Sequence, residues 1–272
     1  MKPFVKWAGG KTQLLDNILN MIPSNFGHYY EPFVGGGAVF LNLKNKNTTI
    51  NDKNVQLYST YVNIRDNVDE LIKTITKLDS IECDKDYYYS IREKYNQKII
   101  SACNDVEMSA FFIWLNKHAF NGLYRVNSKG LFNVPYNNGK NNSIDENNLR
   151  EISLYLGDVV IKNEDFYDVC SNAKSGDFIY FDPPYIPQSQ TAYFTDYNSD
   201  GFGYEDNVRL LNLSKELTQK GCYVMLSNND VELIYDLYKD FFIHKIPAKR
   251  MINSNANNRN GSEVIITNYE VL

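Results

Sequence analysis

The sequence predicts an α/β protein in which a mostly parallel sheet is interrupted by a helical insertion. The clearest strand runs from Asp177 to Phe181 and is bulky and aromatic, as is typical of a strand buried on both faces. Other strand-like runs lie towards both ends of the chain, whereas residues 55–115 show only helical patterns. We therefore expect both ends of the sequence to build the sheet and the middle to form the insertion.

Composition places the chain among globular proteins. Its 272 residues can bury a large core, and 43% hydrophobic residues exclude a mostly disordered protein. The first fifteen residues lack the apolar core of a signal peptide, and no run reaches membrane-spanning length. The four cysteines and three histidines are scattered, so we expect no metal site and reduced core thiols in a cytoplasmic protein.

The distribution of charge is more informative than its sum. A net charge of −5 argues weakly against a nucleic-acid partner, because such proteins usually present a basic face. However, residues 1–15, 108–144 and 241–262 contain lysines but no Asp or Glu. Acid-poor loops also arise by chance in an Asn-rich protein. If they do not arise by chance here, we expect these three stretches to form one surface that meets an anionic partner.

The N-terminal motif is Lys6-Trp7-Ala8-Gly9-Gly10-Lys11-Thr12. Its Gly-Lys-Thr ending resembles a P-loop, but Val5 stands where that loop needs its first glycine and no strand precedes it. A helical pattern follows from Leu14 to Ile22. A glycine turn before a helix, beside Trp and Lys, can bind a carboxylate-bearing ligand.

A second glycine turn, Gly35–Gly37, follows a predicted strand at Tyr29–Phe33 and precedes a helix. Consecutive glycines let the backbone approach a ligand closely. Phe40 stands where a dinucleotide fingerprint has its third glycine, so a dinucleotide is not the first expectation. The next predicted strand, residues 48–50, leads to Asp52, and an acidic residue at that point is placed to bind ribose hydroxyls.

The basic segment Asn116–Asn142 ends the insertion and combines donors with apolar side chains. The donors can reach base edges or phosphates, and the apolar groups can wedge or stack against bases. The donors are Asn121, Arg125 and Lys129, and the apolar groups are Phe120, Leu123 and Tyr124. A surface hairpin packed on the helices is the simpler alternative.

The α/β pattern resumes after Asp145. Strands are predicted at residues 159–161, 177–181 and 222–227, and helices at 163–166 onwards, 208–217 and 232–238. Phe241–Ile246 and Val264–Thr267 are predicted to close the sheet as a hairpin.

The strand at Asp177–Phe181 ends abruptly at Asp182-Pro183-Pro184-Tyr185. Two prolines stiffen the chain just beyond the carboxyl end of the strand, where open α/β sheets place their ligands. This corner suits a planar amine, because Asp182 and the Pro183 carbonyl can each accept one of its hydrogens while Tyr185 stacks on the ring. The alternative is a plain strand-ending turn.

Together these motifs resemble DNA adenine-N6 methyltransferases of the Dam type, nearest to the GATC methylases of restriction–modification systems. The resemblance covers nearly the whole chain. It rests on five segments, namely Lys6–Lys11, Glu31–Gly37, Asn51-Asp52, Asn121–Tyr136 and Asp182–Tyr185.

The resemblance implies a class I methyltransferase fold that uses S-adenosylmethionine (AdoMet) and flips an adenine out of double-stranded GATC. The seven-stranded, Rossmann-like, mostly parallel sheet would end in an antiparallel hairpin. Residues 1–56 and 145–272 would form the catalytic domain, and residues 57–144 the inserted target-recognition domain. We expect a monomer that acts on DNA, with no metal or membrane partner and with a cognate restriction endonuclease in the same system.

The resemblance also assigns residues to roles. Asp182, Pro183, Pro184 and Tyr185 are expected to be catalytic. The expected AdoMet contacts are Trp7, Ala8, Gly9, Gly10, Lys11, Glu31, Phe33, Gly35, Gly36, Gly37, Asp52, Asp165, Phe166 and Asp182. The expected DNA contacts are Lys6, Phe120, Asn121, Leu123, Arg125, Asn127, Lys129, Pro135 and Lys140. Phe120 would insert beside the flipped base, and Lys6 would read the outer guanine.

The chain departs from the family pattern after Pro135. Relatives commonly have Gly and Arg after the aromatic residue, whereas this chain has Tyr136-Asn137-Asn138-Gly139-Lys140, so Lys140 would substitute for the phosphate-binding Arg. Three alternatives remain. They are cytosine-N4 methylation, methylation of a protein glutamine or an RNA amine, and a catalytically silent DNA-binding relative.

Overall fold

A computed structural model describes residues 1–138, 143–186, 202–249 and 260–271, and it divides the chain into two compact units. Unit 1 contains Met1–Gly10, Gly35–Lys46 and Asp52–Asn163, and unit 2 contains Lys11–Val34, Asn47–Asn51 and Glu164–Leu272. The chain changes unit after Gly10, Val34 and Asn51. Three of the predicted functional motifs therefore contribute residues to both units.

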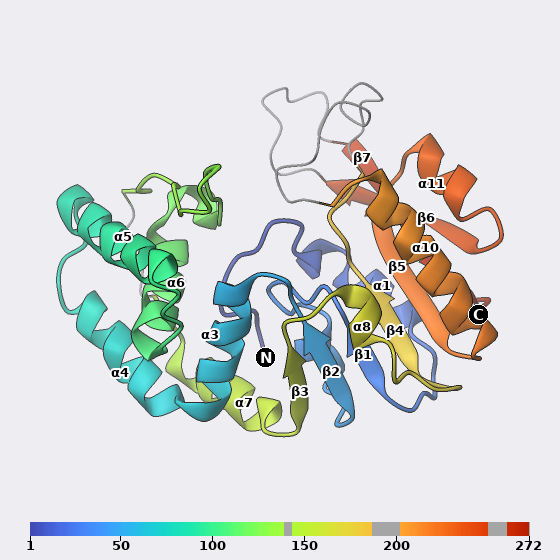
Figure 1. The fold of residues 1–272 in the computed structure, drawn as a ribbon, viewed down its shortest axis with the longest axis horizontal. Coiled ribbons are helices and arrows are strands. Elements are labelled where there is room, and N and C mark those ends of the chain that lie inside the picture. The colour runs from blue at the N-terminus through green and yellow to red at the C-terminus, as the bar shows by residue number, and fades with distance from the viewer. Residues whose placement is uncertain (139–142, 187–201, 250–259, 272) are drawn as a thin grey trace. The chain divides into compact units, whose positions relative to one another are not determined.

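The strands form one seven-stranded sheet in the order β3-β2-β1-β4-β5-β7-β6 (Figure 1). They are β1 (Tyr29–Glu31), β2 (Thr48–Asn51), β3 (Val159–Lys162), β4 (Phe178–Phe181), β5 (Tyr223–Asn229), β6 (Phe242–Lys249) and β7 (Asn260–Thr267). Within unit 2, β2, β1, β4 and β5 pair in parallel, whereas β7 is antiparallel to both β5 and β6. The predicted sheet and its closing hairpin are confirmed.

The helices of unit 2 either precede its first strand or lie between strands in the sequence. They are the 3-10 turn η1 (Lys11–Gln13), α1 (Leu15–Met21), α8 (Phe166–Val169), α10 (Tyr204–Gln219) and α11 (Glu232–Leu237). The side chain of Asp165 caps α8 by accepting the Tyr167 N–H at 3.0 Å. This cap explains why the predicted helix begins there.

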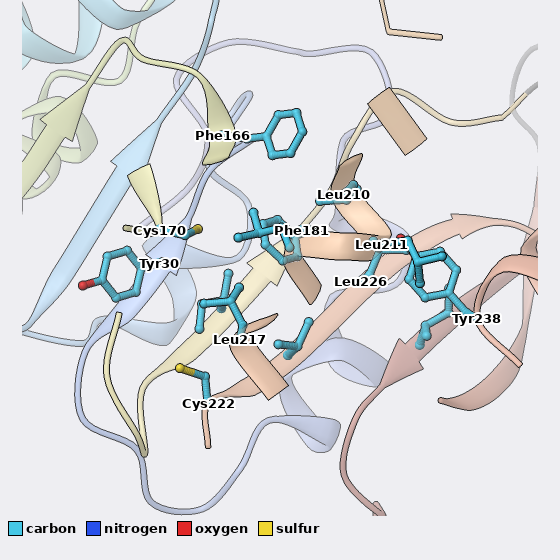
Figure 2. Packing of buried hydrophobic residues seen from close by; sticks show 14 of the residues in the cluster. Tyr30, Phe166, Cys170, Phe181, Leu210, Leu211, Leu217, Cys222, Leu226 and Tyr238 are labelled. Atoms are coloured by element: carbon cyan, nitrogen blue, oxygen red, sulfur yellow. The ribbon is translucent and has the colours of Figure 1, made fainter. Parts of the chain in front are cut away.

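The core of unit 2 is an apolar cluster between strands and helices (Figure 2). Strands β1, β4 and β5 contribute Tyr30, Phe181 and Leu226, and α10 contributes Leu210 and Leu217. β4 is buried at every position, as its unbroken apolar sequence predicts. The Asp182 corner thus follows a strand that the core holds rigidly.

Unit 1 is mainly helical. Its helices are α2 (Phe40–Leu43), α3 (Val55–Asp66), α4 (Val68–Asp79), α5 (Lys85–Ile100), α6 (Val106–His118), the 3-10 turn η2 (Phe120–Gly122) and α7 (Glu146–Leu156). Side-chain oxygens of Asn54, Asp84, Asp105 and Asp145 cap α3, α5, α6 and α7. Residues 55–115 contain no strand, as predicted. The predicted insertion, residues 57–144, lies within unit 1, and its extent as a domain remains a prediction.

The prediction that all four cysteines are core thiols is wrong for two of them. Cys170 and Cys222 are buried, but Cys83 and Cys103 are partly exposed. The latter two lie in the connections before and after α5, where the chain turns at the surface. In the described part of the chain, no helix is both long and apolar enough to cross a membrane.

Candidate functional site

The Asp182 carboxylate lies immediately after β4 and receives two hydrogen bonds within unit 2. Lys11 Nζ lies 2.7 Å from its Oδ1 atom, and the Ser227 hydroxyl donates to the same atom at 2.8 Å. Lys11 is buried, whereas 18% of the Asp182 side chain remains exposed. The carboxylate is therefore fixed in orientation and still reachable from outside.

Burial and hydrogen bonding act on Asp182 in opposite directions. Burial raises the pKa of this carboxyl above its ordinary value, and Lys11 and then Ser227 oppose the increase. The nearby carboxylate of Glu263 also raises the pKa of Asp182. The ammonium group and the hydroxyl thus stabilise the ionised, hydrogen-accepting form.

The rest of the corner is held from several sides. The Lys11 ammonium lies 4.5 Å from the centre of the Tyr185 ring, and the Tyr185 hydroxyl donates to Glu263 at 2.7 Å. Beyond it, the Ile186 N–H donates to the side chain of Asn228 at 3.1 Å, and the Asn229 side chain donates to the Ile186 carbonyl at 2.8 Å. Pro183 is buried. Both ends of the corner are thereby anchored.

Three residues at the end of β5 carry out much of this anchoring, namely Ser227, Asn228 and Asn229. None of the three was predicted from the sequence. Their signal is present, because three polar residues end an otherwise apolar strand, and strand ends are where parallel sheets bind ligands. Ser227 and Asn228 are buried, which marks them as partners of other groups in the protein.

The other predicted cofactor residues of unit 2 lie near β1 and α8. Glu31 is buried and accepts the Tyr29 hydroxyl at 2.7 Å. Phe33 packs against the Phe166 ring at a centroid distance of 5.4 Å. Arg209 lies 4.9 Å from the Phe166 ring centre and pairs with Asp165 at 2.8 Å. A role in cofactor binding remains a prediction for Glu31, Phe33, Asp165 and Phe166.

In unit 1, the second glycine turn is bonded to Asp52. The Gly35 N–H donates to one carboxylate oxygen of Asp52 at 3.0 Å, and the Asn54 N–H donates to the other at 2.9 Å. Burial raises the pKa of Asp52 to about 6, against these two hydrogen bonds. The side chain remains partly exposed. Asp52 is thus an oriented acceptor beside a glycine turn.

The glycines of this turn are required by backbone conformation and by space. Gly35 has a φ angle of +48°, and a Cβ added there would lie 2.8 Å from Cδ1 of Trp7. Gly37 has a φ angle of +77°, and its added Cβ would lie 2.7 Å from the Tyr61 hydroxyl. The same hydroxyl donates to the Gly35 carbonyl at 2.9 Å. The turn therefore packs directly against Trp7 and Tyr61.

The first glycine turn brings Trp7 close to the second one. The Gly10 N–H donates to the Trp7 carbonyl at 3.1 Å, which closes the turn. Ala8, Gly9 and Gly10 are exposed. Within unit 1, Trp7, Gly35 and Asp52 consequently lie together, as the motifs predict for one binding site, although their ligand contacts remain predictions.

We call residues 119–136 the reading segment. Antiparallel bridges join Ala119 to Tyr136 and Val126 to Phe132. The simpler alternative of a surface hairpin therefore describes its backbone correctly. The predicted DNA contacts Phe120, Asn121 and Arg125 are nevertheless exposed, and Phe120 exposes half of its surface. Leu123 is partly buried.

Polar contacts in the reading segment set the direction of its long side chains. Arg125 donates through Nε to the Asn133 side chain at 2.9 Å. Asn127 uses its side-chain oxygen to accept the N–H groups of Lys129 and Leu131. Asn127 is thus part of the turn, and its role as a DNA contact stays a prediction. Lys140 lies outside the described residues.

Side chains of helix α5 hydrogen-bond to the backbone of the reading segment. Asn96 both accepts the Phe132 N–H at 2.9 Å and donates to the Phe132 carbonyl at 3.1 Å. Tyr88 donates to the Val134 carbonyl at 3.0 Å. These two residues are eight positions apart and therefore share one helix face. The roles of Tyr88 and Asn96 were not predicted from the sequence.

The predicted contacts Lys6 and Pro135 are both held near the paired ends of the reading segment. The buried Asn116 accepts the Lys6 N–H at 2.8 Å and donates to the carbonyls of Lys6 and Gly122, both at 2.9 Å. The Pro135 carbonyl accepts the Phe120 N–H at 2.9 Å. Asn116 therefore links the N-terminal segment at Lys6 to the reading segment at Gly122 within unit 1.

Comparisons with known proteins agree with this arrangement. Residues 7–252 match the family of D12 class N6 adenine-specific DNA methyltransferases. The chain is 44% identical to the type II methyltransferase M1.LlaDCHI of Lactococcus lactis subsp. cremoris, with 99% of this chain and 96% of the relative covered. It is 41% identical to the type II methyltransferase M.MjaIII of Methanocaldococcus jannaschii, with 99% of both covered.

A more distant relative extends the same relationship. The DNA adenine methylase of Escherichia coli K12 is 31% identical, over 99% of this chain and 95% of the relative. The family match covers the glycine turns, the reading segment and the Asp182 corner. The chain therefore belongs to the D12 class of N6 adenine-specific DNA methyltransferases, and it is an AdoMet-dependent enzyme acting on DNA.

Proposed function

We propose that the protein methylates the N6 amine of an adenine flipped out of double-stranded GATC. The observation that carries the proposal is the partly exposed carboxylate of Asp182, fixed by Lys11 and Ser227 beside two prolines and Tyr185. Such a fixed acceptor suits an exocyclic amine. The GATC sequence itself is supported by the motif resemblance described above.

The residues in both units fit AdoMet as the cofactor. In unit 1, Asp52 presents an oriented carboxylate to accept ribose hydroxyls, and the Gly35 turn that orients it packs closely against the indole of Trp7. In unit 2, the partly exposed ring of Phe33, which packs against the buried Phe166, offers an aromatic face. Each unit, taken by itself, thus presents groups suited to this cofactor, whose contribution when bound is a methyl group on an electrophilic sulfonium.

The corner has to make a poor nucleophile reactive. The lone pair of the adenine amine is withdrawn into the ring. When Asp182 and the Pro183 carbonyl accept its two hydrogens, the nitrogen becomes more pyramidal and its developing positive charge is stabilised. Tyr185 stacks on the base and holds it in place, which supplies the orientation. No covalent link between the protein and the base is needed.

The target adenine has to leave the base stack, because its amine cannot be reached inside a duplex. The exposed ring of Phe120 is suited to fill the space that the base vacates. Asn121, beside it, has a φ angle of +57°, which turns the chain sharply at this point. Arg125 would then read a guanine edge in the major groove.

The experiment is to treat unmodified duplex DNA with the protein and AdoMet, digest part to nucleosides, and sequence the rest for modified adenines. We expect N6-methyladenine confined to GATC. N4-methylcytosine as the product would replace adenine with cytosine as the target. Cofactor binding without any modified base would instead identify a silent DNA-binding relative.

We further infer that the protein acts as a monomer in the cytoplasm and protects DNA from a cognate endonuclease. The two relatives named type II methyltransferases support the last inference. Plasmid DNA from cells expressing the protein should resist a methylation-sensitive nuclease that cuts GATC. The mass of the protein in solution should be that of one chain.

A further inference from the structure

Tyr124 is one of the apolar residues for which the sequence suggested wedging or stacking against bases, and the structure shows its ring partly buried and packed within unit 1. It immediately precedes Arg125 in the reading segment. Its ring stacks on Trp7, with ring centroids 5.2 Å apart and an interplanar angle of 20°. Trp7 in turn packs against Gly35. Tyr124 therefore connects Trp7, which packs against the second glycine turn, to Arg125, which is predicted to read a base.

The other contacts of Tyr124 fix it to the helices of unit 1. Its ring packs on Phe112 of α6 and on Phe132, with centroid distances of 5.1 and 5.4 Å. Its hydroxyl lies 3.1 Å from the hydroxyl of Tyr95 on α5. Phe132 is the residue whose backbone Asn96 holds. The ring is thus packed on several sides rather than free to turn.

A second connection runs through the Tyr124 hydroxyl. Burial raises the pKa of Tyr124, and the neighbouring side chains of Tyr95 and Asn54 oppose that increase. The Asn54 N–H is one of the two groups that orient the Asp52 carboxylate. Tyr124 therefore stacks directly on Trp7, and its hydroxyl lies in the neighbourhood of the residue that orients Asp52.

We propose that Tyr124 is a positioning residue that couples AdoMet binding to recognition of the target sequence, an inference that rests on the proposed function. Cofactor contacts that fix Trp7 also fix the Tyr124 ring stacked on it, and Tyr124 fixes the backbone that carries Arg125. Packed and hydrogen-bonded contacts of this kind carry energetic coupling between sites. Because such coupling is reciprocal, the target duplex should raise cofactor affinity by the factor by which the cofactor raises duplex affinity.

The test measures the affinity of S-adenosylhomocysteine, the unreactive product of the cofactor, by calorimetry. Each protein is titrated alone, with a GATC duplex, and with a scrambled duplex of the same composition. For the wild type, we expect the GATC duplex to tighten binding by about fivefold or more, and the scrambled duplex to change it little. Tyr124→Leu should reduce the GATC effect to less than about twofold.

Two further variants separate coupling from packing. Tyr124→Phe keeps the ring stack but loses the hydroxyl contacts, so its coupling should lie between those of the wild type and Tyr124→Leu. It also carries the test if Tyr124→Leu does not fold. Tyr136→Leu is the matched control, because Tyr136 packs on Tyr88 at 5.2 Å in the same segment. It should retain wild-type coupling.

The proposal is overturned if the GATC duplex does not tighten S-adenosylhomocysteine binding to the wild type. It is also overturned if both Tyr124 variants show the same tightening as the wild type, whatever their absolute affinities for S-adenosylhomocysteine and for the duplex. Failure of the proposed function gives a different result. In that case, the wild-type protein forms no N6-methyladenine in the GATC duplex, whatever its affinity for S-adenosylhomocysteine.

Discussion

The Asp182 corner of unit 2 and the reading segment of unit 1 differ in how firmly their predicted functional side chains are held, although asparagine side chains bond to the backbone in both regions. At the corner, side chains hold a side chain, since Lys11 and Ser227 contact the carboxylate of Asp182 itself. In the reading segment, side chains hold the backbone, since Asn96 bonds to both polar groups of Phe132. Phe120 and Arg125 consequently remain exposed.

This difference follows from the task of each region. A group that stabilises charge in a reaction works best when it is fixed before the substrate arrives. A side chain that recognises DNA bases needs a rigid backbone beneath it, but its end group has to remain accessible. Substitutions at the corner should therefore change the rate of methyl transfer, whereas substitutions in the reading segment should change which sequence is methylated.

The largest effect is expected for Asp182→Ala, which removes the acceptor at the corner. Turnover should fall by about a thousandfold or more, while the circular dichroism spectrum and melting curve remain those of a folded protein. The measurement is incorporation of labelled methyl groups into GATC-containing DNA. Wild-type rates in this variant would refute the role given to Asp182.

A smaller effect, on sequence preference rather than rate, is expected for Arg125→Ala. A bidentate contact from arginine to a guanine contributes about 1–3 kcal/mol of discrimination against the wrong base. Competition between duplexes that differ at one base pair would measure the loss. Lys129→Ala is the control, because loss of a phosphate contact weakens all duplexes alike and lowers the salt dependence. An unchanged preference in Arg125→Ala would contradict the assignment.

Ser227→Ala should lower kcat by about tenfold with little change in KM, because the Asp182 acceptor loses one of its orienting hydrogen bonds. The Ser227 hydrogen bond lowers the pKa of Asp182. Its removal should therefore raise that pKa and move the acidic limb of the pH profile to higher pH. Ser214→Ala removes another buried hydroxyl of unit 2, one bonded to a helix carbonyl, and should leave the profile unchanged.

The smallest expected effect concerns the pH dependence of cofactor binding. Asp52 has a pKa of about 6, and only its ionised form can accept two ribose hydroxyls. The affinity for S-adenosylhomocysteine should therefore fall by about tenfold between pH 7 and pH 5. Calorimetry at several pH values measures this decrease. Asp52→Asn should bind weakly and without that dependence, and a wild-type affinity independent of pH would contradict the role.

The parts of the site that could be predicted from the sequence are those whose conformation is set by neighbouring residues. The paired prolines after β4 identified Asp182, and the consecutive glycines identified the turn at Gly35. In both cases the conformation is set by residues adjacent in sequence, so a local pattern is sufficient.

The partners of those residues could not be predicted in the same way. Ser227 is 45 positions from Asp182, and the two meet only because β4 pairs with β5. Asn96 and Asn116 resemble ordinary polar helix residues in the sequence, although Asn116 is fully buried. Their roles follow from tertiary packing, which the helical pattern does not reveal.

The measurement that tests the central claim most directly is the single-turnover rate of Asp182→Asn, with protein in excess and the cofactor saturating. The asparagine keeps the shape of the side chain but removes its negative charge. We predict N6-methyladenine formation slower by about a hundredfold or more, with duplex affinity unchanged. A rate equal to that of the wild type would show that the carboxylate at this corner is not what makes the adenine amine reactive.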